Sequence, residues 1–565
     1  MRSERERLFA DNCAALASRD PSLAAALMRC VPDPSISFAT SRTGALVPEV
    51  HGPEGGVLLH SRYDPSAEAA RQASAWEGAG CIVVLGLGGG FHVASMLRSR
   101  QVATVIVVEK DVPVLRSLFE RLSLGELLAD RRTCLIAGTR GLRRRIIELW
   151  QPSLMGGLRT FALRAWCARE KEFCEEATRE VASAVQAARA DYSVQAHFGK
   201  RWFLNMLGNM PEAETSSTPA GEGSARVAAA GPSLDMQLRR LADARDEGPL
   251  FAVDTSLPAL MRAGISPDAV VSIDCQIHGY HHFMQGIPER AALYLDLASP
   301  PLFARGRKRV FFVAGNHPFA TWLGARWRRL ATVDTSGGNV THAAVSLALN
   351  LGATDITLYG ADFSYPAGKA YARGTYLFDY FGVRADRVQA IESGMYSLVF
   401  RTGDARGERA GGHLRYTTAL LSSYRERLLE LVQGSGARFH AVEGEGLPLA
   451  SAGISGHSPA VALIPRIDTG GTAGGRCGWR DALEEYAWVV SRLPGLADPP
   501  WASLGSLAAT QLEAWSTLLP VAARITRESR EPMTPAATLD AARSWALAKV
   551  RRILDSPIQA GEPHE

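Results

Sequence analysis

Apolar runs without charged residues alternate with helical patterns in two separate parts of the chain. In the first part, residues 81–97 predict a buried strand, a glycine turn and a helix, and a second buried strand ends at Glu109. The run RRTCLIAG at 131–138 predicts a third strand. Uncharged β-branched strands separated by helices are typical of a parallel sheet. The pattern therefore predicts an N-terminal domain over 1–190 with a Rossmann-like part at about 80–150.

The second part shows the same alternation over residues 225–360. A helical pattern at 339–351 lies between two apolar runs, and a helix near 418–433 followed by ARFHAVEG ends the region. Such alternation predicts a doubly wound, mostly parallel α/β sheet, in a central domain over 199–450. The predicted strands are ARVAAA, PLFAVD, AVVSID, AALYLDL, RVFFVAG and DITLYG.

The remaining segments are predicted from helical spacing and from turn-forming residues. Residues 160–208 are mostly helical by composition, and the Pro-, Ser- and Thr-rich stretch 211–224 predicts a linker. The Gly-rich stretch 468–476 predicts a flexible hinge. Residues 465–565 contain Leu, Ala and Trp at helical spacing without a strand signal, which predicts an α-helical C-terminal domain.

Composition and charge narrow the class of protein. The 565 residues are 46% hydrophobic and 21% charged, with a formal net charge of +4, so nucleic-acid binding is not indicated. The sequence shows neither a secretory signal nor an apolar stretch long enough for a membrane span, which predicts a cytoplasmic protein. The eight cysteines have no zinc-site spacing, so we expect reduced thiols and no structural metal.

The first candidate site is the glycine turn of the N-terminal domain. Gly86, Gly88 and Gly90 lie between a predicted strand and a helix, and Glu109 ends the next strand about 20 residues on. Glycines let a backbone approach a ligand, and a carboxylate can accept bonds from ribose hydroxyls. The spacing fits NAD, S-adenosylmethionine or a turn that needs glycine only for packing, and it is a possible second site.

The second candidate site begins at Gly231-Pro232-Ser233, directly after the strand RVAAA and at the start of a helix. Glycine permits the tight turn, proline suits the first helical turn and serine can cap free N–H groups. The carboxyl end of a parallel strand is where α/β sheets bind nucleotides. A simple helix cap is the alternative.

Polar residues also follow the other predicted strands of the central domain. Because parallel strands end at one edge of a sheet, these residues are expected to converge on one nucleotide cleft, although any one Asp could instead be a cap. The set consists of Asp254, Thr255, Asp274, Thr335, Ser336, Gly337, Gly338, Asn339, Gly360 and Asp362.

These motifs resemble the core of the motility accessory factor (Maf) flagellin glycosyltransferases. The resemblance rests on GPSL, DTS, SID and the stretch from Thr335 to Tyr365, with KRWFLN before it and HAVEG after it. It covers residues 80–450 and is concentrated in 225–365. The same core is similar to bacterial sialyltransferases that use CMP-activated sugars, and to a 6-hydroxymethylpterin diphosphokinase family.

The likeness to the sialyltransferases implies roles for further residues. In that family, the positions that match Gly231, Ser233, Asp254, Ser336 and Gly337 line the CMP site. Its phosphate-binding tyrosines match Tyr371 and, with an offset of one residue, Tyr365. Its catalytic His precedes the closing helix, where His413 is the nearest candidate. This chain departs from the family in having Ala230 and Asp254 where Asn is usual, so different donor contacts are expected at these two positions.

The Maf resemblance implies transfer of a nonulosonic acid from a CMP-sugar donor to Ser or Thr of flagellin or another flagellar protein, without a required cofactor. The first alternative is a pyrophosphoryl transferase using ATP and Mg²⁺, held by Asp254, Asp274 and Asp362. A second is a non-catalytic flagellin-binding assembly factor on the same core. A third is a methyltransferase using the glycine turn.

Overall fold

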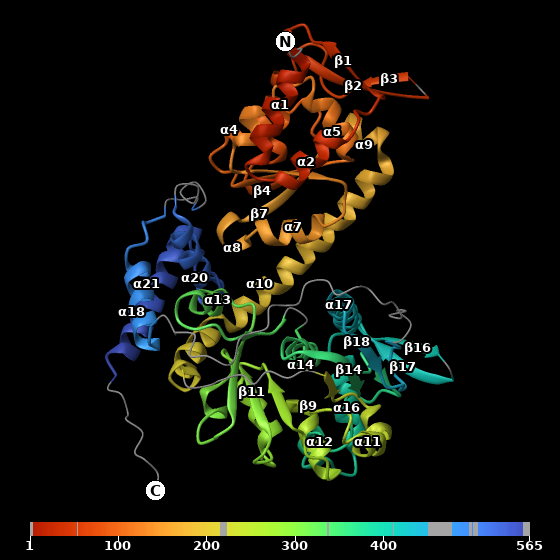
Figure 1. Cartoon of the computed structure of the whole chain (residues 1–565), viewed down its shortest axis with the longest axis vertical. Helices are drawn as coiled ribbons and strands as arrows, with labels where there is room; N and C mark the ends of the chain where they lie inside the picture. The colour runs from red at the N-terminus through yellow and green to blue at the C-terminus, as the bar shows by residue number, and fades with distance from the viewer. Residues whose placement is uncertain are drawn as a thin grey trace. The chain divides into compact units, whose positions relative to one another are not determined.

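The computed structural model describes residues 4–53, 55–214, 223–335, 338–410, 412–449, 477–496, 500 and 507–556. The chain divides into two compact units (Figure 1). Unit 1 consists of Met1–Gly199 and Val490–Ala546, and unit 2 of Lys200–Val489 and Leu547–Glu565. The long helix α10 (Lys171–Glu214) contributes residues to both units.

Unit 1 contains the predicted Rossmann-like sheet. Its four parallel strands have the order β6-β5-β4-β7. The two central strands are buried at every residue, as their apolar sequences predict. The edge strand β7 was not predicted because most of its residues are exposed. The strands are β4 (Ala79–Leu85), β5 (Thr104–Glu109), β6 (Thr133–Ala137) and β7 (Gly157–Ala162), and the helices between them are α4 (Phe91–Arg98), α5 (Val112–Phe119), α6 (Gly125–Ala129), α7 (Leu142–Leu149) and α8 (Pro152–Met155).

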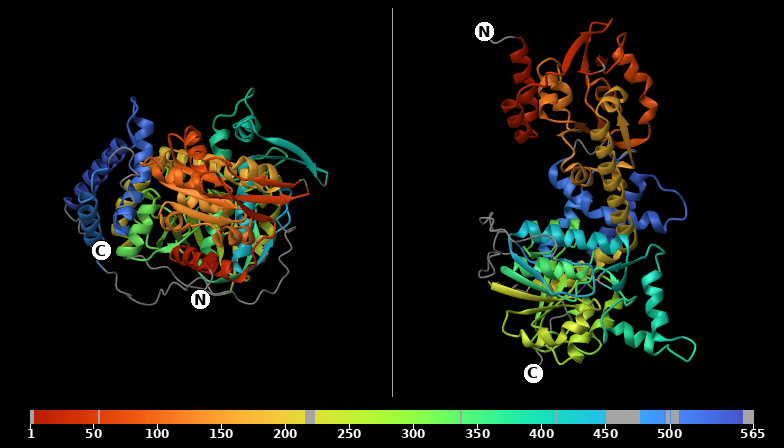
Figure 2. Two further views of the ribbon diagram at one scale, coloured as in Figure 1. Left: turned by 90° about the horizontal axis from the view of Figure 1, so that it is seen from above. Right: turned by 90° about the vertical axis from the view of Figure 1, so that its right-hand side faces the viewer.

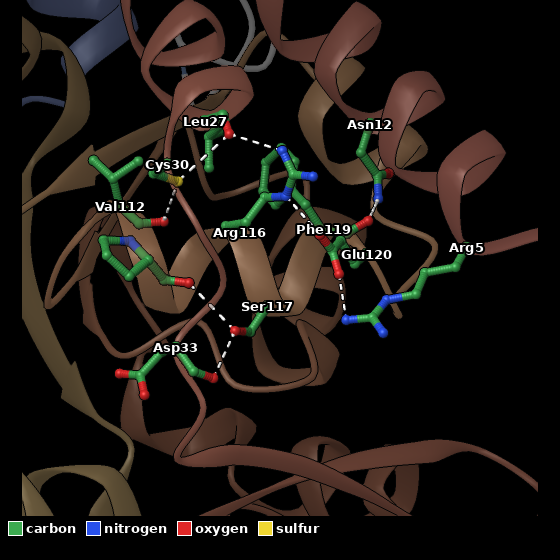
Figure 3. A network of polar contacts seen from close by, with 11 residues as sticks. Arg5, Asn12, Leu27, Cys30, Asp33, Val112, Arg116, Ser117, Phe119 and Glu120 are labelled. Carbon is green, nitrogen blue, oxygen red and sulfur yellow. Dashed lines mark hydrogen bonds and ion pairs between the residues drawn. The ribbon is translucent and has the colours of Figure 1, made fainter.

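A buried polar network joins the N-terminal helices to α5 (Figure 3). The side chain of Asn12, 1% exposed, donates to the carbonyl of Phe119 at 2.9 Å. Arg116 donates to the carbonyl of Leu27 at 3.0 Å and to Glu120 at 2.6 Å. The bonds of Asn12 to Phe119 and of Arg116 to Leu27 join the first two helices to α5, and the bond of Arg116 to Glu120 holds the guanidinium in place within α5. The segment comprises α1 (Glu4–Ala17), α2 (Pro21–Arg29) and the antiparallel strands β1 (Ile36–Thr40), β2 (Leu46–Gly52) and β3 (Gly55–Leu58), followed by α3 (Pro65–Arg71).

The cysteine prediction was wrong for one pair. Cys167 in α9 (Arg164–Arg169) and Cys174 in α10 form a disulfide, with their Cα atoms 5.5 Å apart. The turn between the two helices brings together residues seven positions apart, a separation that matches no sequence motif. The tertiary path of the chain, and not the cysteine spacing, creates this bond.

Unit 2 is built on an eight-stranded sheet with the order β13-β12-β11-β10-β9-β8-β14-β18. Every neighbouring pair is parallel, which confirms the predicted parallel sheet. All of the predicted strands are present, and only the two-residue β13 was not predicted. The strands are β8 (Gly223–Ala228), β9 (Leu250–Val253), β10 (Ala269–Ser272), β11 (Ala292–Asp296), β12 (Val310–Ala314), β13 (Ala331–Thr332), β14 (Ala353–Tyr359) and β18 (Arg438–Ala441).

Apolar side chains cover both faces of this sheet, as a doubly wound fold requires. On one face, Val227 and Val253 pack with residues of α14 (Val340–Asn350) and α17 (Ala419–Ser435). On the other, Ala228 and Ala252 pack with Leu234 and Leu260. The helices on this second face are α11 (Leu234–Asp243) and α12 (Leu257–Arg262), and α13 (Pro318–Arg326) connects β12 to β13.

An insertion follows β14 and projects from the sheet of unit 2 (Figure 2). It contains a small antiparallel sheet with the order β15-β17-β16 and two short helices. Its own core includes Ala370, Met395 and Val399. None of the elements of this insertion was predicted from the sequence. The elements are β15 (Tyr365–Pro366), α15 (Tyr376–Gly382), α16 (Ile391–Phe400), β16 (Arg406–Ala410) and β17 (His413–Thr417).

The C-terminal region is helical, as predicted, with α18 (Trp479–Ser491), α20 (Ala509–Glu528) and α21 (Pro535–Leu554). By their contacts these helices divide between the two units and do not form a third one. The predicted linker begins too early, since Pro211 lies inside α10 and the helix continues to Glu214. Residues 215–222 and the predicted hinge at 468–476 lie outside the described residues. Among the helices in the described ranges, none is long and apolar enough to cross a membrane.

Candidate functional site

The strand order of unit 2 reverses between β8 and β14. From β8 the chain proceeds through β9 to β13 on one side, and β14 returns to the other side of β8. Ligands of open α/β sheets bind at such a switch point, outside the carboxyl ends of the strands. The turn after β8 contains Gly231 and Ser233, and the turn after β14 contains Gly360 and Asp362. Four of the predicted site residues therefore meet at the expected place.

These two turns are held together by the carboxylate of Asp362. It accepts a bond from the backbone N–H of Ser233 at 2.8 Å, and the hydroxyl of Ser233 donates to its other oxygen. The N–H of Gly231 donates to the carbonyl of Gly360 at 2.8 Å. Asp362 is 4% exposed, and burial raises its pKa. The carboxylate thus occupies the N-terminal end of α11, where an anion would otherwise be favoured.

Two further carboxylates follow β9 and β10. Asp254, 1% exposed, accepts from the N–H of Thr255 at 2.6 Å and from the hydroxyl of Ser272 at 2.6 Å. Asp274 is partly exposed and accepts from the N–H of Gln276 at 2.9 Å. Burial raises the pKa of Asp274, and the nearby charge of Asp254 acts in the same direction. Asp254 is therefore largely occupied by its own neighbours, whereas Asp274 can accept a bond from a ligand.

Tyrosines of the insertion lie close to these carboxylates. Burial raises the pKa of Tyr371 to about 12, and Asp254 contributes in the same direction. Burial also raises the pKa of Tyr376, with Asp274 and Asp254 adding to the effect. Both phenols are therefore protonated near neutral pH and can donate hydrogen bonds. Tyr365 lies in β15 and is half-buried, and its pKa is also raised by burial.

The turn before α14 contains the other predicted residues. Asn339 caps this helix, because its side chain accepts from the N–H of His342 at 2.9 Å. The N–H of Gly338 donates to the carbonyl of Thr335 at 2.9 Å. Ser336 and Gly337 lie outside the described residues. Asn339 thus has a structural partner within the turn.

Two residues that the sequence did not single out as site residues position the loops at this edge. Asn205 on α10 donates to the carbonyl of Cys275 at 3.1 Å and to that of Ala298 at 2.7 Å. Gln237 on α11 accepts from the N–H of Gly360 at 2.7 Å and donates to the carbonyl of Glu443 at 2.9 Å. The only sequence signal for these contacts was the resemblance to the Maf family of KRWFLN, which contains Asn205, and of HAVEG, which contains Glu443.

The predicted base, His413, begins β17 next to the turn of the β16–β17 hairpin. Its side chain is 60% exposed, and its Nδ1 lies 3.8 Å from the carboxylate of Glu445. The N–H of Glu445 in turn donates to the hydroxyl of Ser233 at 2.8 Å. His413 is therefore connected to the Ser233–Asp362 corner through Glu445, and it is largely open to water.

The glycine turn of unit 1 lies at the switch point of its own sheet, after β4. Gly86, Gly88 and Gly90 all have positive φ, which explains the choice of glycine. The N–H of Gly89 donates to Nε2 of His60 at 2.7 Å, and that of Leu87 donates to Glu109 at 2.9 Å. Burial raises the pKa of Glu109 to about 7. The sequence assigned the glycine turn and the Glu109 carboxylate to a possible ligand. In the structure Glu109 accepts a bond from the turn itself, and His60 accepts another.

A pH-dependent contribution of His60 to stability follows. Burial lowers its pKa to about 3, so the folded state keeps it neutral while the unfolded chain protonates it below about pH 6.5. Stability from this group is present above pH 6.5 and is lost as the pH falls. Comparing wild type with His60→Gln by urea denaturation, we expect the wild-type advantage to shrink by up to about 1.4 kcal/mol per pH unit between pH 6.5 and 4.5. Parallel curves for the two proteins would contradict this.

Comparisons with known proteins agree with this architecture. The family described as 6-hydroxymethylpterin diphosphokinase MptE-like matches residues 203–368. Two uncharacterized proteins of Treponema pallidum (strain Nichols) are 33% and 32% identical to the chain over 171 and 139 residues, which are 30% and 24% of this chain. The chain spans 60% and 66% of their lengths.

The solved structure of the Maf glycosyltransferase from Magnetospirillum magneticum AMB-1 is similar over 97% of this chain and 95% of that protein. The TM-score is 0.54 at 15% sequence identity, so the likeness concerns the fold. Both resemblances inferred from the motifs, to the Maf proteins and to the diphosphokinase family, are therefore confirmed as resemblances. The fold class is α/β with a Rossmann-like N-terminal part and a helical C-terminal region.

Proposed function

We propose that the protein is a glycosyltransferase that binds a nucleotide-sugar donor at the carboxyl edge of the unit 2 sheet. The observation that carries the proposal is the meeting of polar turns at the β8–β14 switch point, beside Asp274 and the protonated Tyr371 and Tyr376. The Maf glycosyltransferase that shares this fold supports the reaction class.

In this proposal, each group of residues at the carboxyl edge of the unit 2 sheet has its own role in donor binding. Protonated phenols can donate to a leaving phosphate, so Tyr371 and Tyr376 would stabilise the departing nucleotide. Asp274 has accepting capacity left for ribose hydroxyls. In this proposal Gly231, Pro232, Ser233, Gly360 and Asp362 line the donor site together with Thr335, Gly338 and Asn339. The predicted Ser336 and Gly337 lie outside the described residues.

The donor in this proposal is a CMP-activated nonulosonic acid, and the acceptor is a Ser or Thr hydroxyl of flagellin or another flagellar protein. The motif resemblance to Maf proteins and sialyltransferases supports both choices. A cytoplasmic location and a role in motility belong to the same proposal. No metal is assigned to the transfer itself.

The second candidate is pyrophosphoryl transfer from ATP, favoured by the family match over residues 203–368. This reaction would need Mg²⁺ between Asp254, Asp274 and Asp362. In the structure Asp362 is bonded to Ser233, and Asp254 to Thr255 and Ser272. Within the described ranges, no three His, Cys, Asp or Glu side chains are placed to hold a metal ion together. The glycosyltransferase proposal therefore accounts better for the edge, and a non-catalytic flagellin-binding role is the third candidate.

The test is a thermal-shift experiment on the full chain with CMP, CDP, ATP and S-adenosylmethionine, each with and without Mg²⁺. A ligand that binds only the folded state raises the apparent stability, by about 2.7 kcal/mol at 100 times its Kd. We expect CMP to raise Tm without Mg²⁺. Replacing the cleft phenol in Tyr376→Phe should reduce the shift, while Tyr280→Phe, an exposed phenol of the same unit, should not. Preference for ATP with strict Mg²⁺ dependence would establish the diphosphokinase candidate instead.

A further inference from the structure

The transfer reaction requires a group that takes the proton of the acceptor hydroxyl, and the environments of the histidines in unit 2 differ sharply. His317 is buried and caps α13 by accepting from the N–H of Phe319 at 3.1 Å. His342 is 1% exposed and lies 3.1 Å from Asp334. His413 is 60% exposed, and His440 is an exposed residue of the edge strand β18. A general base must be reachable by substrate and also screened from bulk water, and these four residues satisfy only one condition each.

His282 satisfies both conditions. It lies in the short helix η3 (Ile277–Phe283), which begins three residues after Asp274, and its side chain is only partly exposed. The ring of Tyr376 stands edge-on to the imidazole, with centroids 4.7 Å apart. Its Nδ1 is buried and has no hydrogen-bond partner within the described ranges, while Nε2 is not among the buried unpartnered atoms. The imidazole is thus held between the insertion and the carboxyl edge of the sheet, with one nitrogen enclosed.

A carboxylate lies near the imidazole of His282. Asp274 is close enough that His282 acts to lower the pKa of that carboxyl, against the larger opposing effect of burial. The other titratable groups near this region are Asp254 in the turn after β9, Tyr376 on α15 and His281 on η3. A base that takes up a proton becomes positively charged in the transition state. The Asp274 carboxylate near His282 would stabilise that charge.

We infer that His282, and not His413, accepts the proton of the acceptor hydroxyl. This inference rests on the proposed glycosyltransferase function. With its proton on Nδ1, the neutral ring offers Nε2 as the acceptor. As the acceptor oxygen forms its bond to the anomeric carbon, its proton passes to Nε2 of His282. The bond from that carbon to the phosphate oxygen breaks, and CMP leaves with the electron pair. The proton on His282 then returns to solvent.

The neighbouring His281 provides a matched control. It lies on the same helix, and its ring stacks on the same Tyr376 with centroids 5.4 Å apart, but it is exposed. The assay is release of CMP from CMP-N-acetylneuraminic acid with purified flagellin as the acceptor. His282→Gln should lower kcat/KM by about 10²–10⁴-fold. His281→Gln and His413→Ala should each stay within about threefold of wild type.

Two further readouts separate proton transfer from a structural role. The thermal shift caused by CMP should be the same in wild type and His282→Gln, because the substitution leaves donor binding intact. The acid limb of the pH profile of kcat/KM, present in wild type, should be absent in His282→Gln. If both His282→Gln and His282→Asn lose the CMP shift or unfold, His282 is a structural residue and the inference is overturned.

The outcomes also distinguish this inference from the proposed function. If wild type binds CMP and transfers the sugar, but His282→Gln does so within about threefold, only the assignment of His282 fails. Loss of transfer in His413→Ala with retention in His282→Gln would return the role to His413. If wild type neither binds CMP nor releases it from the donor, the glycosyltransferase proposal itself fails.

Discussion

Replacing Gly231 by alanine is expected to destabilise unit 2 by about 3 kcal/mol, because the turn has no room for a side chain. A Cβ at this position would meet the Asp362 carboxylate and, at 2.5 Å, the backbone carbonyl oxygen of Gly360. The carbonyl belongs to the β14 turn that already accepts the N–H of Gly231, so it cannot move without loss of that bond. Urea denaturation of wild type and variant measures the difference.

Gly324 is the matched control for this substitution. It lies in α13 of the same unit, and a Cβ there would meet nothing within 4 Å. Since alanine is a better helix former than glycine, Gly324→Ala should be neutral or stabilising by up to about 1 kcal/mol. Equal effects of the two substitutions would show that the contact between the β8 and β14 turns is not tight.

Removing the carboxylate in Asp362→Ala is expected to cost about 3 kcal/mol, because Ser233 loses the partner of its buried N–H and of its hydroxyl. The raised pKa of Asp362 shows that burial opposes the charged form, so these bonds offset a real desolvation cost. Urea denaturation again measures the loss. Asp355→Ala is the control, since Asp355 lies on β14, the strand that precedes Asp362, and forms a surface ion pair with Arg438 at 3.0 Å. Its removal should cost less than about 1 kcal/mol.

The substitutions Gly231→Ala and Asp362→Ala should couple in a double-mutant cycle. Loss of the Asp362 carboxylate relieves one of the two clashes at Gly231, so the double variant should be less destabilised than the sum of the single variants. Strict additivity would mean that the Gly360 carbonyl alone opposes a side chain at residue 231.

The sequence determined the two parallel sheets because their strands are buried on both faces. The run LFAV contains no polar residue, and TVIVVE contains polar residues only at its two ends. Such apolar runs can be recognised in the sequence without knowledge of the neighbouring strands. Strand β7 was not predicted because most of its residues are exposed, and β13 because it is only two residues long. Strands β16 and β17 both contain charged residues and lack the uncharged apolar run that marks the predicted strands. Their formation depends on neighbours distant in the sequence.

The sequence also named the polar residues at the strand ends, but it could not assign their partners. Ser233 was predicted to cap its own helix, and the structure bonds it to Asp362, 129 positions away. The glycine turn of unit 1 was predicted from its spacing, and only the fold brings His60 onto it, 29 positions before Gly89. Partners at such separations are chosen by the order of strands in the sheet.

What the sequence alone determined is the α/β class, the parallel strands and the edge at which their polar ends gather, because apolar periodicity and strand direction are local properties. What only the tertiary structure decided is which of those polar groups bind one another and which stay open. His282 is the clearest case: its run IHGYHHF carries no motif, and only the fold of the insertion after β14 brings the ring of Tyr376 to 4.7 Å from it.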